Sequence, residues 1–431
     1  MYLSLEQALE LHHTTLNMIS LAKLLEIAVV KTPFRTGPAG KRGGEKKKKK
    51  KKKRKKREKS FERRRMLATE GEGGSDVVEW QPLKGADDEE SAISQRDKQA
   101  IAICKTLIKE WVPSAEANVE VITGGITNAL FKVTNVELGE ENSKKAVILR
   151  VFGDNTDLLI DRKKELSVLL QLNEHGFGAK VLATFRNGRI EEYLTSKAMD
   201  YTQCVQEKYI SKIAKLTAKF HLLNIDSPRE PNLWDTVWDW YKTACGLDFS
   251  QDDAKREAYE RIDFRSMKVE LSEVQDMCTR IDPKIVWSHS DLLPGNIMLE
   301  ADTDAMTFID FEYSSYGYQC FDIGNHWNEC MGLECNMELY PSVEKRRLFV
   351  QEYLEAFNGA SPSEAEVDDL LLEAEFFVLV SHVFWCSWSI IQARYSKIDF
   401  DYIEYYQKRW EYFRQLKTET FSKLEARFNS K

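Results

Sequence analysis

The spacing of apolar residues in this chain changes near residue 194, from the period of strands to that of helices. Upstream, short apolar or alternating runs such as NVEVI and AVILRVFG have the pattern of β-strands. Downstream, apolar residues recur every three or four positions, as in KIAKLTAKFHLL, which is typical of helices. The pattern predicts a small sheet-rich region followed by a larger helical one, and 431 residues suffice for both.

The first region contains enough strand signals for one sheet. Expected strands occupy residues 118–122, 129–136, 146–153, 180–185 and 189–194, and a helix covers 161–176. The Asn187-Gly188 pair between the last two strands is a pair that tight hairpin turns favour. We expect a sheet lobe over residues 96–193 and a helical lobe over residues 194–431.

The first 95 residues have a different composition. Residues 41–65 hold 18 Lys and Arg against 3 Glu, a charge of +15, so the net charge of −7 leaves the rest of the chain near −22. A run of like charges repels itself and buries no apolar surface, which predicts a disordered leader over residues 1–95. The tract is either a solvated tail or a contact for nucleic acid or an anionic membrane.

Cysteine usage and apolar runs bear on the compartment. The eight cysteines are scattered and form no CxxC pair, which favours reduced thiols over a zinc site or a disulfide framework. The stretch TTLNMISLAKLLEIAVV is interrupted by Lys23 and Glu26 and lacks the features of a secretory signal. A later apolar run, residues 376–391, is short for a bilayer span and predicts a buried helix. We therefore expect a cytoplasmic protein.

One segment of the helical region carries a distinctive set of polar residues. In HSDLLPGN, Asp291 precedes Asn296 by five positions, and Asp310 follows 14 positions later at the end of an apolar run. Phosphoryl transfer to a hydroxyl needs a carboxylate that accepts the hydroxyl proton, and oxygen ligands that hold magnesium on the nucleotide phosphates. The spacing predicts Asp291 as the proton acceptor and Asn296 and Asp310 as metal ligands. His289 is expected to be a packed scaffold residue.

These loops resemble those of the protein-kinase-like superfamily, and residues 100–420 resemble the choline/ethanolamine kinase family. The resemblance implies an α+β, two-lobed fold with a small antiparallel-sheet N-lobe and a larger helical C-lobe. Glu312 stands where protein kinases have the Gly of DFG, and no activation segment follows, which argues against a protein kinase. Asp322 of FDIGNH is implied to hold the catalytic loop through backbone N–H groups.

The resemblance also implies a site for ATP and Mg²⁺. ITGGITN resembles the loop that covers the phosphates, and Arg150 stands where the family has a basic residue that meets them, with Glu165 as its ion-pair partner. The alternatives are a plain hairpin turn, a surface Arg and an ordinary helical Glu. The implied nucleotide-binding residues are Gly124, Gly125, Asn128, Arg150, Glu165, Glu192 and Leu194, the last two in the strand that accepts the adenine edge.

The acceptor pocket is implied to hold a cation. Glu329 is the candidate counter-charge, and Trp385 and Trp388 share one helix face, where aromatic rings can surround an ammonium group. Tyr405 and Tyr313 are further candidates for this pocket. For an isolated Trp pair, packing in the core is the alternative.

The stretch WNECMGLE resembles ethanolamine-type members of the family, and its Asn328 is expected to add a polar group to the pocket. The expected activity is ATP-dependent phosphorylation of the ethanolamine hydroxyl to phosphoethanolamine, the first step of phosphatidylethanolamine synthesis. A choline kinase or a mixed choline/ethanolamine kinase is the alternative, and a homodimer is left open. An aminoglycoside-type phosphotransferase would share the loops without explaining the aromatic set, and a pseudokinase would normally lack one of the three loop residues.

Overall fold

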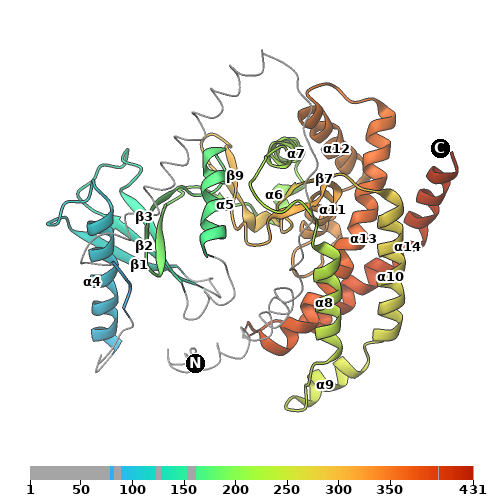
Figure 1. Ribbon diagram of the computed structural model, residues 1–431, viewed down its shortest axis with the longest axis horizontal. Helices are drawn as coiled ribbons and strands as arrows, with labels where there is room; N and C mark the ends of the chain where they lie inside the picture. Colours follow the sequence, from blue (N-terminus) through green and yellow to red (C-terminus); the bar gives the residue numbers. More distant parts are fainter. Residues whose placement is uncertain (1–77, 82–88, 123–127, 153–161, 397, 431) are drawn as a thin grey trace, which may run out of the picture. The chain divides into compact units, whose positions relative to one another are not determined.

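The computed structural model describes residues 78–81, 89–122, 128–152, 162–396 and 398–430 (Figure 1). These residues form two compact units. The sheet unit comprises the described residues up to Glu174 together with Ala179–Thr195, and the helical unit comprises His175–Gly178 and the chain from Ser196 onward. The Lys-rich tract and the predicted phosphate loop at Gly124 and Gly125 lie outside the described residues.

The sheet unit contains the antiparallel sheet that the strand patterns predict. Its five strands run in the order β1-β2-β3-β5-β4. Their bounds are Ala117–Ile122 for β1, Asn128–Asn135 for β2, Ala146–Phe152 for β3, Val181–Phe185 for β4 and Gly188–Glu192 for β5. The β4–β5 hairpin turns at the predicted pair, where a Cβ on Gly188 would lie 2.3 Å from the backbone oxygen of Arg150. Only glycine fits that close approach.

Helices complete the sheet unit. Its helices are α4 (Glu89–Leu107) and α5 (Arg162–Glu174), and α4 buries Ile103 and Cys104 in one core with β2 and β3. Before α4, Trp80 stacks on Phe131 with ring centroids 5.1 Å apart. The predicted leader of residues 1–95 is therefore too long, because apolar residues that its overall composition conceals pack on this sheet.

The helical unit is built around one long apolar helix. The helices are α6 (Tyr201–Cys204), α7 (Glu207–His221), α8 (Leu233–Cys245), α9 (Asp253–Glu260), α10 (Phe264–Ile281), α11 (Gln319–Glu329), α12 (Val343–Asn358), α13 (Glu364–Tyr395) and α14 (Tyr402–Ser430). Among the described helices, only α13 is long and apolar enough to cross a membrane, but 72% of its apolar window is buried in the protein. The predicted buried helix over 376–391 is thus confirmed.

Close packing against α13 positions α11. A Cβ on Gly324 would lie 2.7 Å from the backbone nitrogen of Val378, so glycine lets the two helix backbones approach. On the opposite end of α13 from its capping box at Ser363, the chain turns back into α14, which lies beside α13 in Figure 1. Three helices therefore meet where α11 ends.

Short strands bring the predicted catalytic loops together. β7 (Ile285–Ser288) pairs with β10 (Ser315–Tyr318), and β8 (Ile297–Leu299) lies between β6 (Lys197–Ala198) and β9 (Met306–Phe308). Asp310 does not end the β9 strand as predicted. It lies two residues beyond it with φ of 61°, in the left-handed region that Asp tolerates better than most residues.

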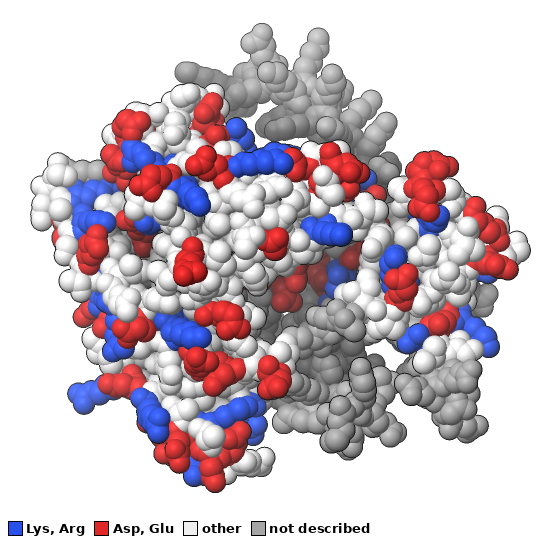
Figure 2. All heavy atoms as spheres, turned by 180° about the vertical axis from the view of Figure 1, so that it is seen from behind, with Lys and Arg blue, Asp and Glu red and all other residues white. Residues whose placement is uncertain are grey.

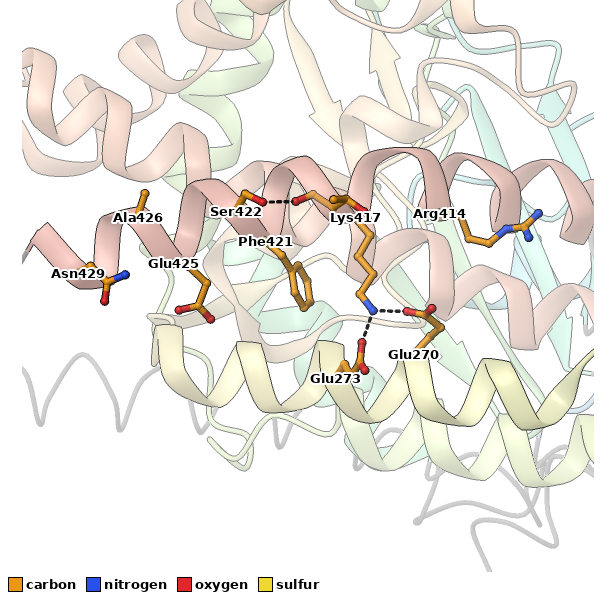
Figure 3. A pocket seen from close by; sticks show the side chains of 10 residues that line it. Glu270, Glu273, Arg414, Lys417, Phe421, Ser422, Glu425, Ala426 and Asn429 are labelled. Carbon is orange, nitrogen blue, oxygen red and sulfur yellow. Dashed lines mark hydrogen bonds and ion pairs between the residues drawn. The ribbon is translucent and has the colours of Figure 1, made fainter.

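The described surface mixes charges of both signs. Figure 2 shows acidic and basic side chains interspersed over one face. A shallow groove between α10 and α14 illustrates this, because Lys417 of α14 is paired there with both Glu270 and Glu273 of α10 (Figure 3). These ion pairs connect the two helices at the surface.

Candidate active site

The loop that carries Asp291 is held by its backbone. The N–H groups of His289 and Ser290 donate to the two carboxylate oxygens of Asp322, each at 2.6 Å, so the hydrogen bonds expected of Asp322 are present. Ser290 has φ of 67°, a conformation that persists only when its surroundings hold it. His289 is fully buried with Nε2 2.9 Å from the Ile309 carbonyl oxygen, and burial lowers its pKa. A neutral His289 thus links this loop to the segment that carries Asp310.

Asp322 belongs to a buried network of hydrogen-bonded side chains. His221 of α7 lies with Nε2 3.0 Å from Asp322 and Nδ1 2.8 Å from the Tyr353 hydroxyl, which also accepts from Gln319 Nε2 at 2.8 Å. His221 thus joins Asp322 of α11 to Tyr353 of α12. Burial opposes ionisation of Asp322, but the hydrogen bonds from His221 and from the His289 backbone N–H keep its pKa below the usual value. Asp322 is thus an ionised anchor for the loop.

Asp291 and Asn296 contact each other at the far end of the same loop. Asn296 Nδ2 donates to the backbone oxygen of Asp291 at 2.9 Å and to its Oδ2 at 3.2 Å. Asn296 Oδ1 therefore points away from Asp291. The pKa of Asp291 is raised well above its usual value by burial and by the negative charges of Glu329, Asp310 and Glu312. A carboxyl group among these negative charges would be stabilised by a nearby cation.

The metal-ligand prediction fits the local geometry. Ile309 N–H donates to the Asn296 carbonyl oxygen at 3.0 Å, so Asn296 and Asp310 lie at one end of the β8–β9 pair. In the part of the chain that the structure describes, no group of three or more His, Cys, Asp and Glu could hold a metal ion. An amide oxygen and a carboxylate suit magnesium, which keeps water and phosphate oxygens as its other ligands.

His326 gives the loop a second anchor. Its Nδ1 lies 3.0 Å from the carbonyl oxygen of Leu292, next to Asp291, and burial lowers its pKa to about 4. A neutral His326 therefore donates to the loop backbone near neutral pH.

The predicted aromatic residues of α13 lie together. The Trp385 ring meets Tyr313 and Trp388 edge to face, with centroids 6.1 and 5.3 Å apart. Asn325 of α11 orients this group, because its Oδ1 accepts from Trp385 Nε1 at 2.7 Å and from Ser381 Oγ at 2.8 Å. We call the rings of Trp385, Trp388 and Tyr313 the aromatic wall. Asn325, which was not predicted from the sequence, holds this wall in place.

Glu329 has an unpredicted partner. Its carboxylate pairs with Arg409 of α14, which also donates from Nε to the Tyr405 hydroxyl at 2.9 Å. Tyr405 therefore belongs to the Glu329–Arg409 group, and its hydroxyl serves as an acceptor there. Asn328 is buried and donates to the Val378 carbonyl oxygen at 3.0 Å, so it joins α11 to α13 instead of adding a polar group to a pocket.

In the sheet unit, the predicted Arg150–Glu165 ion pair is wrong. Arg150 pairs with Glu191 at 3.4 Å, whereas Glu165 pairs with Arg189 at 2.9 Å and with Arg162 at 2.7 Å. The sheet register explains the exchange. Arg150 of β3 lies directly opposite Arg189 of β5, and both reach Glu191, which shares their face of the sheet.

The remaining predicted nucleotide residues lie in or beside strands. Asn128 begins β2, Glu192 ends β5, and Leu194 follows it. The backbone N–H of Glu192 donates to the Lys180 carbonyl oxygen at 2.8 Å. An adenine contact at Glu192 through that N–H is therefore unfavourable, and the roles of Asn128 and Leu194 stay predictions.

Four residues of the site were missed by sequence reasoning: His221, Asn325, His326 and Arg409. Asn325 and His326 lie inside the FDIGNH motif, and Arg409 follows Tyr405 by four positions on a predicted helix. These were usable signals, since residues four apart share a helix face. His221 carried no comparable signal.

Comparisons with known proteins identify the relatives of this chain. The model of the family "Choline/ethanolamine kinase" matches residues 119–414. The probable ethanolamine kinase of Arabidopsis thaliana is 36% identical over 324 residues, covering 75% of this chain and 86% of that protein. Probable choline kinase 1 of the same plant is 31% identical, covering 72% and 91%.

A solved structure shows the same fold. An ethanolamine kinase from Plasmodium vivax superposes with a TM-score of 0.63 at 30% identity, covering 76% of this chain and 89% of that chain. The fold is protein-kinase-like, with an N-terminal antiparallel sheet followed by a largely helical region, as predicted. The chain belongs to the choline/ethanolamine kinase family, whose members are ATP-using kinases of phospholipid synthesis.

Proposed function

We propose that this protein transfers the γ-phosphoryl group of ATP to the hydroxyl of ethanolamine and so forms phosphoethanolamine, the first step of phosphatidylethanolamine synthesis. The observation that carries the proposal is the placement of Asp291. Its carboxyl group accepts a hydrogen bond from Asn296. Besides burial, the negative charges of Glu329 and Asp310 raise its pKa. A molecule with a hydroxyl at one end and a cation at the other suits that arrangement.

Each residue has a defined task in this mechanism. Asp291 orients the ethanolamine hydroxyl and accepts its proton as the phosphoryl group is transferred. Asn296 and Asp310 would hold Mg²⁺, which when bound offsets the negative charge of the ATP phosphates. Asp322 keeps the loop in place through its two short backbone hydrogen bonds.

Glu329 supports ethanolamine as the acceptor. A primary ammonium carries N–H donors and needs acceptors, whereas a quaternary ammonium has none and relies on aromatic faces. Glu329 is a carboxylate with one oxygen bonded to Arg409, which leaves a localised acceptor. The relatives named ethanolamine kinase support the same choice.

Choline is the second candidate. Trp385, Trp388 and Tyr313 form a group of aromatic rings, the chemistry that a quaternary ammonium requires. Choline kinases are also among the relatives, at 31% identity. A mixed specificity would use both features.

Titration of each acceptor separately tests the proposal. ATP consumption is measured in Mg²⁺ with ethanolamine, with choline and with a panel of peptides. We expect kcat/KM for ethanolamine to exceed that for choline by about tenfold or more, equivalent to one missing hydrogen bond to a charged group, and no turnover of peptides. Failure to phosphorylate either amino alcohol would overturn the proposal.

A further inference from the structure

Arg409 is the most deeply buried cation of the described site. Its side chain is only 1% exposed, and it comes from α14 to meet Glu329 at the end of α11. Its guanidinium carbon lies 5.2 Å from the centroid of the Tyr405 ring, whose hydroxyl it also contacts. A buried Arg is retained only where its charge and its donors are matched.

The Glu329–Arg409 pair is accessible on one side only. The side chain of Glu329 is 11% exposed, against 1% for Arg409. What a solute can reach is therefore the Glu329 side chain, while the guanidinium lies behind it. The bond from Arg409 involves Oε1, so Oε2 is the oxygen left for another donor.

Glu329 lies in a part of the site that already holds the acidic residue Asp291. Burial raises the pKa of Asp291, and the negative charge of Glu329 raises it further. On α13, His382 is buried beside Arg409, and burial and that cation lower its pKa well below the usual value, so His382 stays neutral. Arg409 is thus the positive charge that compensates Glu329, and its fork reaches both Glu329 and Tyr405, which a Lys amine would not reproduce.

We propose that Arg409 is a positioning and specificity-determining residue, which holds the Glu329 side chain turned so that one carboxylate oxygen accepts hydrogen bonds from a primary ammonium. This inference rests on the proposed function and assigns Arg409 no contact with the substrate. A localised acceptor serves an N–H donor and does little for a quaternary ammonium. Loss of Arg409 should therefore harm ethanolamine binding more than choline binding.

Kinetics of Arg409→Met test the proposal. We expect KM for ethanolamine to rise about 10-fold to 100-fold, the range of a lost hydrogen bond to a charged group, with a smaller rise for choline and KM for ATP within about twofold of native. Arg414→Met is the matched control, since Arg414 lies on the same helix in an exposed pair with Glu411. Equal rises in KM for ethanolamine, choline and ATP would contradict the proposal.

A second variant separates positioning from folding. Arg409→Met leaves a buried carboxylate without its partner, whereas Arg409→Met combined with Glu329→Gln removes both charges. We expect the double variant to recover the melting temperature lost in Arg409→Met and to show the KM of Glu329→Gln alone, because Arg409 acts only through Glu329. A KM for ethanolamine well above that of Glu329→Gln in the double variant would overturn the inference, and this comparison does not require Arg409→Met to fold.

The two proposals fail in different ways. If the native protein turns over neither amino alcohol, the proposed function fails. If the native protein phosphorylates ethanolamine and Arg409→Met keeps the native KM, only the role of Arg409 is lost.

Discussion

The catalytic loop and the Glu329–Arg409 group are organised by different means, although both depend on α11. The loop is held through its backbone, by Asp322 on two N–H groups and by His326 on a carbonyl oxygen. Glu329 and Trp385 are instead held side chain to side chain, by Arg409 and Asn325. A backbone anchor tolerates changes in the side chains of the loop, whereas a side-chain anchor ties each pocket residue to one partner.

The difference suggests which part of the protein can vary. In the proposed function, the chemistry common to phosphoryl transfer depends on the backbone-anchored loop, while the choice of acceptor depends on pairs that a single substitution can change. The catalytic loop and the Glu329–Arg409 group should therefore respond differently to mutation. Four experiments examine that difference.

Removal of Asp291 should produce the largest effect. We expect Asp291→Ala to lower kcat by about 10²-fold to 10⁴-fold, the usual contribution of a positioned proton acceptor, while ATP affinity stays near native. Steady-state kinetics and nucleotide titration measure both quantities. Asp304→Ala, in a surface ion pair with Lys208, is the control, and native turnover in Asp291→Ala would remove this residue from the mechanism.

Acidification should weaken the loop anchor at His326. Its pKa is about 4 in the folded protein, against 6.5 as the ordinary value, so below pH 6.5 the unfolded chain binds a proton that the folded state does not. Stability should fall between pH 6.5 and pH 4 by about 3 kcal/mol from this residue alone. Denaturant unfolding at several pH values measures the slope, which should be shallower in His326→Asn. An unchanged slope in that variant would contradict the assignment.

Substitution of Asn325 should disturb the aromatic wall and spare the loop. Asn325→Ala leaves the Trp385 indole and the Ser381 hydroxyl without their shared acceptor, at a cost of about 1–3 kcal/mol in unfolding free energy. KM for both amino alcohols should rise several-fold, because the Trp385 ring loses the acceptor that orients it, with KM for ATP unchanged. A change confined to KM for ATP would place Asn325 elsewhere.

The smallest effect is expected in the surface groove of Figure 3. Lys417 pairs with Glu270 and Glu273 outside the site, and surface pairs contribute about 0–1 kcal/mol. The free energy of unfolding of Lys417→Met should lie within about 1 kcal/mol of the native value, and its KM values should be unchanged. A marked rise in KM for ethanolamine would show that α14 transmits changes from this groove to Arg409.

The same contrast explains what could be read from the sequence. Asp291 and Asn296 lie within one short loop, and the strands of the sheet unit alternate clearly, so their chemistry and pairing follow from local pattern. The side-chain partners His221 of Asp322, Asn325 of Trp385 and Arg409 of Glu329 lie 101, 60 and 80 residues away. Which residues meet there depends on how helices rotate against one another, and no local pattern records that rotation.

Register caused the error in the sheet unit. The sequence singled out Arg150 and Glu165, whereas the partners that they meet are Glu191 and Arg189. The pairing of Arg150 with Glu191 follows from β3 and β5 lying side by side with Arg150 opposite Arg189. A one-residue shift of that register would have reversed the faces.

A competition experiment compares the two amino alcohols under the same conditions. The protein, ATP and Mg²⁺ are incubated with equal concentrations of ethanolamine and choline, and the products are quantified by phosphorus NMR. Phosphoethanolamine should predominate, by about tenfold or more if Glu329 supplies one hydrogen bond that choline cannot use. Phosphocholine as the major product would contradict the account, because recognition would then rest on the aromatic wall instead of the carboxylate that Arg409 holds.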